Sequence, residues 1–109
     1  AFVQGIKPYK VYTALLSQSG TSAPTATVLE NTLGGTIVWT RVNPGLYSGT
    51  LTGAFTADKT ILLNNNPVGG VFTNIFSSVN TITIQTRNSS NVQTDDGLSN
   101  TSIEIRVYL

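Results

Sequence analysis

The strongest constraint on the fold of this 109-residue chain is an alternation of apolar and polar side chains with a period of two. A β-strand points successive side chains to opposite faces, so an alternating segment has one apolar and one polar face. Residues 81–87 and 101–108 follow this pattern most clearly, which predicts two strands that line a core. Their apolar positions are Ile82, Ile84, Ile103, Ile105 and Val107.

Eight such segments are separated by clusters of glycine, asparagine, proline and aspartate, the residue types that form turns. No segment of useful length has a helical period. This spacing predicts a single all-β domain over residues 1–109, built as an antiparallel β-sandwich or jelly-roll-like arrangement of about eight strands. Residues 1–8 are expected to form an extended N-terminal arm. The expected strands are Tyr9–Ser17, Ala26–Asn31, Thr36–Val42, Leu46–Gly53, Thr60–Leu63, Val71–Asn74, Thr81–Arg87 and Thr101–Tyr108.

Two of these strands, Tyr9–Ser17 and Thr36–Val42, are apolar on both faces. In the second one, Trp39 shares a face with Ile37, and we expect this face to lie in the core. The other face of each strand is covered either by a loop of the same chain or by another subunit, because a two-layer sandwich has no third layer. The second alternative predicts a homo-oligomer, with a trimer favoured. The residues expected at its interface are Tyr12, Leu16, Val38 and Val42.

The residue types that carry most catalytic and metal chemistry are absent or scarce. The chain has no His and no Cys, and only five carboxylates. The only dense acidic pair, Asp95-Asp96 before Gly97, is interpreted as a turn, because a calcium loop needs a longer spaced set of oxygen ligands. A pair of carboxylates for glycoside hydrolysis could be drawn from the five, but nothing in their spacing favours one. We therefore predict a protein that is not an enzyme, with no catalytic residues, no cofactor and no metal site. The five are Glu30, Asp58, Asp95, Asp96 and Glu104.

Charge and hydropathy exclude two further classes of partner. The net charge is +1, and the six cationic residues are scattered singly rather than clustered, so no nucleic acid partner is expected. No apolar run approaches the roughly 18 residues that a membrane helix needs, so no membrane is expected either. Aromatic side chains can stack on sugar rings where they are exposed, so the tyrosines and the polar loops Asn64–Pro67 and Asn88–Asn91 leave binding to a host-surface glycan as an alternative.

Both ends of the chain resemble small bacteriophage proteins. Residues Tyr9–Thr21 and Val28–Gly34 look like an opening found in such proteins from tailed and other phages, notably those of Bacteroidetes hosts, and Asn100–Tyr108 looks like their close. In the middle, only Gly49–Thr56 (Gly-Thr-Leu-Thr-Gly-Ala-Phe-Thr) is similar. The resemblance implies a virion component such as a fibre, spike or decoration protein, and it carries no catalytic motif.

These lines together predict a non-enzymatic virion structural protein that contacts other virion proteins. We expect it to be synthesised in the cytoplasm of the bacterial host and located on the surface of the particle. The first alternative is a receptor- or glycan-binding adhesion module, and the second is a small glycan-active enzyme.

Overall fold

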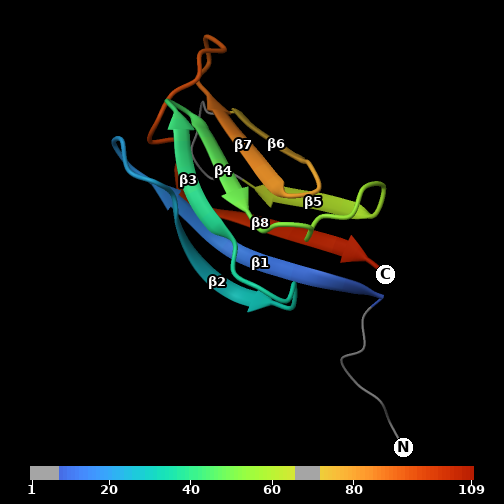
Figure 1. Cartoon of the computed structure of the whole chain (residues 1–109). Coiled ribbons are helices and arrows are strands. Elements are labelled where there is room, and N and C mark those ends of the chain that lie inside the picture. The colour runs from blue at the N-terminus through green and yellow to red at the C-terminus, as the bar shows by residue number, and fades with distance from the viewer. Residues whose placement is uncertain (1–7, 66–71) are drawn as a thin grey trace, which may run out of the picture.

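Eight strands form two four-stranded antiparallel sheets that pack against each other (Figure 1), which confirms the predicted all-β class and number of strands. The computed structural model describes residues 8–65 and 72–109, so nearly all of the expected N-terminal arm lies outside the described residues. No helix capable of crossing a membrane occurs in the described part of the chain. The strands are β1 (Tyr9–Gln18), β2 (Thr25–Asn31), β3 (Val38–Asn43), β4 (Leu46–Thr50), β5 (Thr60–Asn65), β6 (Phe72–Ser77), β7 (Thr81–Arg87) and β8 (Leu98–Tyr108).

The strand order places the first and last strands side by side in the middle of one sheet. This sheet has the order β2-β1-β8-β5, and the other has the order β3-β4-β7-β6. The long ladder between β1 and β8 runs from the pair Tyr9 and Tyr108 to the pair Gln18 and Leu98. The expected final strand is therefore paired along its length. The four edge strands are β2 and β5 in the first sheet and β3 and β6 in the second.

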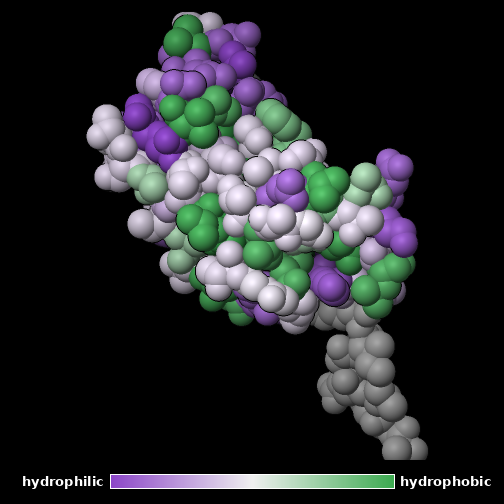
Figure 2. Space-filling model, in the orientation of Figure 1, coloured by the Kyte–Doolittle hydropathy of each residue, from purple (hydrophilic) through white to green (hydrophobic). Residues whose placement is uncertain are grey.

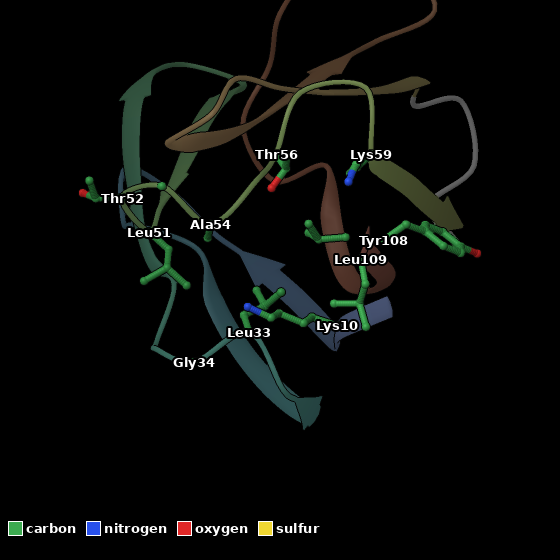
Figure 3. A pocket seen from close by; sticks show the side chains of 12 residues that line it. Lys10, Leu33, Gly34, Leu51, Thr52, Ala54, Thr56, Lys59, Tyr108 and Leu109 are labelled. Carbon is green, nitrogen blue, oxygen red and sulfur yellow. The ribbon is translucent and has the colours of Figure 1, made fainter. Parts of the chain in front are cut away.

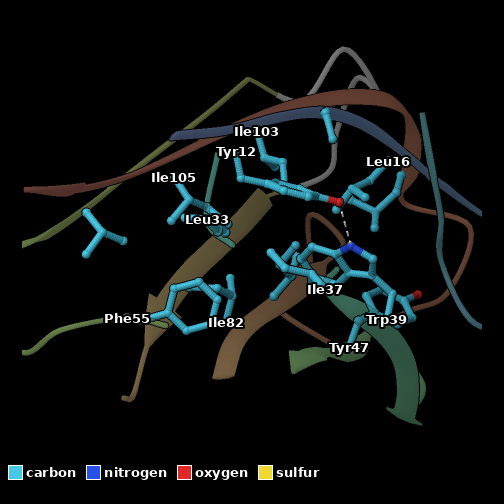
Figure 4. Close-up of a cluster of buried hydrophobic side chains, with 14 residues drawn as sticks. Tyr12, Leu16, Leu33, Ile37, Trp39, Tyr47, Phe55, Ile82, Ile103 and Ile105 are labelled. Carbon is cyan, nitrogen blue, oxygen red and sulfur yellow. Dashed lines mark hydrogen bonds between the residues drawn. The ribbon is translucent and has the colours of Figure 1, made fainter. Parts of the chain in front are cut away.

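The core lies between the sheets and is lined by alternate residues of the central strands (Figure 4). β8 contributes Ile103, Ile105 and Val107, and β7 contributes Ile82 and Ile84, all almost completely buried. The core face predicted for these two strands is confirmed. Each such side chain contributes about 1.5–3 kcal/mol of burial free energy, so the alternation in two strands explains a large part of the driving force for folding.

Trp39 in β3 lies in the core beside Ile37, as its place in the alternation predicts. Its six-membered ring packs over Gly49 in β4, where an added Cβ would lie 2.7 Å from Trp39 Cζ3. A side chain at position 49 would therefore displace the indole. The indole Nε1 donates a hydrogen bond of 3.3 Å to the hydroxyl of Tyr12, which belongs to the opposite sheet.

β1 turns the face that carries Tyr12, Ala14 and Leu16 into the core, where these residues are at most 1% exposed. The expectation that Tyr12 and Leu16 are available to a partner subunit is therefore corrected. These two side chains lie on the face that the second sheet of the same chain covers. Alternation alone shows that β1 has two apolar faces, but it does not show which of them meets the other sheet.

The chain leaves the second sheet earlier than predicted. The strand expected at Leu46–Gly53 ends at Thr50, because the chain turns at Gly53, which has a φ of +71°. Beyond this turn Phe55 enters the core, and its amide donates a hydrogen bond of 3.0 Å to the carbonyl of Val79. Phe55 is therefore a core residue contributed by a connection rather than by a strand, and the strand pattern did not single it out.

Candidate functional site

The structure separates the four residues expected at a subunit interface into two pairs. Tyr12 and Leu16 are buried in the core, whereas Val38 and Val42 in β3 point away from it and are 60% and 54% exposed. Val42 is also the extra residue of a β-bulge, because the pairing with β4 skips from Arg41 to Asn43. Only the β3 pair is therefore accessible to another molecule.

Every exposed large hydrophobic residue that lies in a described strand belongs to an edge strand. The four central strands β1, β4, β7 and β8 expose none among the side chains that the structure describes. On the face seen in Figure 2, hydrophobic residues accordingly form several separate patches between polar ones rather than one continuous surface. We call these exposed strand residues the edge hydrophobics. They are Val28 and Leu29 in β2, Val38 and Val42 in β3, Ile61 and Leu63 in β5, and Phe76 in β6.

Two of the four edge strands, β5 and β6, lack the charged residues and prolines that usually protect a sheet edge from association. β2 contains one charged residue, Glu30, and β3 contains one, Arg41, which is turned towards Asp95. In β2 and β3 a bulge interrupts the ladder, at Leu29 in β2 and at Val42 in β3. Bulges limit backbone pairing with a new strand, so a partner at β2 or β3 would be held mainly by side-chain contacts.

A network of polar side chains joins the two sheets at one end of the sandwich. Asp95 accepts two hydrogen bonds from the Arg41 guanidinium, of 3.1 and 2.7 Å, one from the amide of Gly45, and one from the hydroxyl of Tyr47. The hydrogen bonds from Arg41 are the main reason that the pKa of Asp95 falls to about 2. Burial, reinforced by the hydrogen bond to Asp95, raises the pKa of Tyr47. Asp95 is therefore ionised and Tyr47 neutral at neutral pH.

Gln18 completes this network from β1. Its amide oxygen accepts a hydrogen bond from the Asp96 amide and shares the single Tyr47 hydroxyl proton with Asp95, and its amide nitrogen donates to the carbonyls of Gly20 and Ser22. Because these groups are engaged with one another, the network fastens the loop before β8 to the sheets. The acidic pair lies in a loop as predicted, but nothing in the sequence signals that Asp95 would pair with Arg41.

A second polar cluster lies on the outer face of the first sheet. Glu104 pairs with Arg106, and its carboxylate also accepts a hydrogen bond of 3.2 Å from Thr13. The Arg106 guanidinium lies 4.8 Å from the centre of the Tyr9 ring, which contacts the ring of Tyr108. The Tyr9 ring therefore contacts both Arg106 and the Tyr108 ring, which is tilted by 51° to it.

The other polar residues that could bind a metal ion or a glycan do not converge on one place. Within residues 8–65 and 72–109, no three acidic side chains gather into a possible metal site. In the loop Asn88–Asn91, the Asn88 side chain accepts hydrogen bonds from the amides of Ser90 and Val92, so it shapes its own turn. In the loop Asn64–Pro67, Asn66 and Pro67 lie outside the described residues.

At the end of the sandwich opposite the Asp95 network lies a cavity of about 380 Å³, here called the end cavity (Figure 3). It opens between the start of β1, the end of β8, the turn after β2 and the connection from β4 to β5. Sequence reasoning did not identify it, because its walls come from four separate segments. Its lining residues are Lys10, Leu33, Gly34, Leu51, Thr52, Gly53, Ala54, Thr56, Lys59, Val107, Tyr108 and Leu109.

Comparison with known protein families, with curated proteins and with solved structures finds no match to this chain.

Proposed function

We propose that this chain is a non-enzymatic structural protein of a bacteriophage particle, of the fibre, spike or decoration type, that acts through protein–protein contacts. The observation that carries the proposal is the position of the edge hydrophobics, which are confined to the sides of the sandwich. A catalytic protein would need a convergent set of reactive groups, whereas an assembly protein needs apolar surface at its periphery.

The two sides of the sandwich differ, which favours a ring of copies. β5 and β6 come into contact along one side, and β2 and β3 are the edge strands on the other. If one side of a copy packs against the other side of the next copy, the contact is heterologous, and it forms a ring when the rotation between successive copies closes. Three is the smallest number of copies in such a ring, so we propose a homotrimer. Covering each half-exposed valine or leucine would contribute about 1 kcal/mol.

The bacteriophage setting rests on the resemblance at the two ends of the chain. In the fold, Tyr9–Thr21, Val28–Gly34 and Asn100–Tyr108 contribute to β1, β2 and β8, three adjacent strands of one sheet. The similar segment Gly49–Thr56 contributes the buried Phe55. Most of the resemblance thus concerns three adjacent strands of one sheet, which supports a shared fold and a shared role in the particle.

Light scattering coupled to gel filtration tests the assembly. The natural chain is expected to elute as a trimer at micromolar concentration, and Val38→Asp and Leu63→Asp are each expected to shift it towards the monomer. Val92→Asp is the matched control, because Val92 is equally exposed but lies in a loop rather than in an edge strand. A natural chain that remains an 11.6 kDa monomer would contradict self-assembly of the isolated protein.

Mass spectrometry of purified particles tests the setting. The proposal expects peptides of this chain at a stoichiometry that survives extensive washing of the virions. Their absence from particles of a phage that encodes the chain would contradict a structural role in the virion.

A further inference from the structure

The end cavity combines two cationic side chains with an apolar floor. Lys10 in β1 and Lys59 before β5 stand on opposite walls of the opening (Figure 3). The floor is formed by Leu33, Leu51 and Val107, of which Leu33 and Val107 are buried by the fold itself. The accessible lining of the cavity is more polar than apolar, and its volume of about 380 Å³ falls within the usual range of small-molecule sites.

No acidic side chain of the described residues compensates the two lysines of this cavity. No Asp or Glu lines it, and neither lysine forms an ion pair or a side-chain hydrogen bond with any residue in 8–65 or 72–109. The other cations of the described chain differ in this respect: Arg41 and Arg106 are paired with carboxylates, and Arg87 is hydrogen-bonded to Asn91. Among the described cations, Lys10 and Lys59 are thus the ones without a side-chain hydrogen bond or ion pair, and both line the end cavity.

The other residues that line the cavity indicate which kind of anion could bind there. Thr56 and Lys59 both line the upper wall from the connection before β5 (Figure 3), and Gly34 and Gly53 contribute backbone to the lining. Hydroxyl and peptide groups bind ligand hydroxyls, lysine ammonium groups bind a carboxylate, and aliphatic side chains contact C–H groups. A compound that carries one carboxylate and several hydroxyls on a compact ring meets all three conditions.

We propose that the end cavity binds a sugar acid, with its ring against Leu33, Leu51 and Val107 and its carboxylate in the positive field of Lys10 and Lys59. This goes beyond the structural role proposed above, because it gives the same protein a contact with acidic glycans. The site lies wholly within one copy of the chain, so its occupation does not depend on the number of copies that assemble.

Titration of the ¹⁵N-labelled protein followed by NMR tests the site. Sodium glucuronate is expected to shift the amide signals of Leu33, Gly53 and Lys59 saturably, and glucose at the same concentration is expected to leave them unchanged. Lys10→Gln and Lys59→Gln should each weaken glucuronate binding by about fivefold or more, and raised salt should weaken it further. Lys10→Arg should retain most of the affinity, because the charge is kept.

Three outcomes would overturn the proposal. Equal shifts with sodium sulfate at matched ionic strength would show that any anion is held by charge alone. Binding of hexanoate as tight as that of glucuronate would exclude recognition of the sugar hydroxyls. The third outcome is a loss of affinity in Arg87→Gln that equals the loss in the two lysine variants. Arg87 lies at the far end of β7, so this substitution removes one charge and leaves the cavity intact. None of these results bears on assembly, which light scattering measures separately.

Discussion

The indole Nε1 of Trp39 donates a hydrogen bond of 3.3 Å to the hydroxyl of Tyr12, and this bond joins the two sheets inside the core. Both residues are almost completely buried, at 8% and 1% exposure. Among the described residues, neither the indole N–H nor the Tyr12 hydroxyl has another hydrogen-bond partner in the core. The bond therefore compensates two polar groups that burial would otherwise leave without a hydrogen bond.

Replacing Tyr12 with phenylalanine should destabilise the fold. The substitution removes the acceptor and leaves the indole N–H buried without a partner, which costs about 1–3 kcal/mol. Urea unfolding followed by the fluorescence of Trp39, the single tryptophan, measures the loss. Tyr9→Phe is the control, because the Tyr9 hydroxyl has no hydrogen bond to a described residue. Equal stability of the two variants would contradict a structural role for the bond.

Gly45→Ala should be far more destabilising than Gly20→Ala, although both glycines have a positive φ. At Gly45 an added Cβ would lie 2.5 Å from the Thr94 amide nitrogen and 2.6 Å from the Thr86 carbonyl oxygen, whereas at Gly20 nothing lies within 4 Å. Gly20→Ala should cost about 1–2 kcal/mol from the backbone conformation alone. Gly45→Ala should cost about 3 kcal/mol or more, because backbone atoms must also move. Thermal unfolding of the two variants checks the order.

Acid should weaken the Asp95 network in a narrow range of pH. The folded-state pKa of about 2 lies below the value of about 4 for an unfolded aspartate, so ionised Asp95 stabilises the fold above pH 4. This contribution should be lost as the pH falls from about 4 to about 2. Asp95→Asn should therefore unfold at lower urea concentration than the natural chain at pH 7, with the difference shrinking towards pH 2.

Asp58→Asn serves as the control for the acid experiment. Asp58 is exposed and has a φ of +61°, a conformation that asparagine also adopts readily. The stability of the Asp58→Asn variant should follow that of the natural chain across the same pH range. A difference between the natural chain and Asp95→Asn that stays constant from pH 7 to pH 2 would show that ionisation of Asp95 does not stabilise the fold.

Ile37, just before β3, and Val38, its first residue, should respond very differently to the introduction of a charge. Ile37→Lys places an ammonium group in the core and should cost about 3 kcal/mol or more, whereas Val38→Lys on the outer face should change stability by about 0.5 kcal/mol or less. Chemical unfolding at a concentration where the protein is monomeric separates this effect from assembly. Similar losses in both variants would show that Val38 is buried within one copy.

Local pattern predicts a large part of this fold. The alternation in residues 81–87 and 101–108 predicts both strands and their core faces, and the place of Trp39 beside Ile37 predicts its burial. The strand expected at Leu46–Gly53 is too long, because a turn at Gly53 ends the pairing where local propensity would continue it. These features depend on neighbours in the chain, so short-range reasoning reaches them.

The candidate sites could not be predicted in this way. Arg41 and Asp95 meet only because β3 and the loop before β8 reach the same end of the sandwich. Lys10 and Lys59 face one cavity for the same kind of reason. Likewise, Tyr12 is buried and Val38 is exposed because of which sheet covers which strand.

By itself, the sequence determined the class of the fold, the number of strands and the polar and apolar faces of the most regular ones, because side-chain alternation and turn residues act locally. Only the tertiary structure decided which apolar face of β1 is internal, which strands are edges, and which distant polar groups meet. Those outcomes depend on the order of the strands in the two sheets, and strand order is set by the packing of the whole chain rather than by any segment of it.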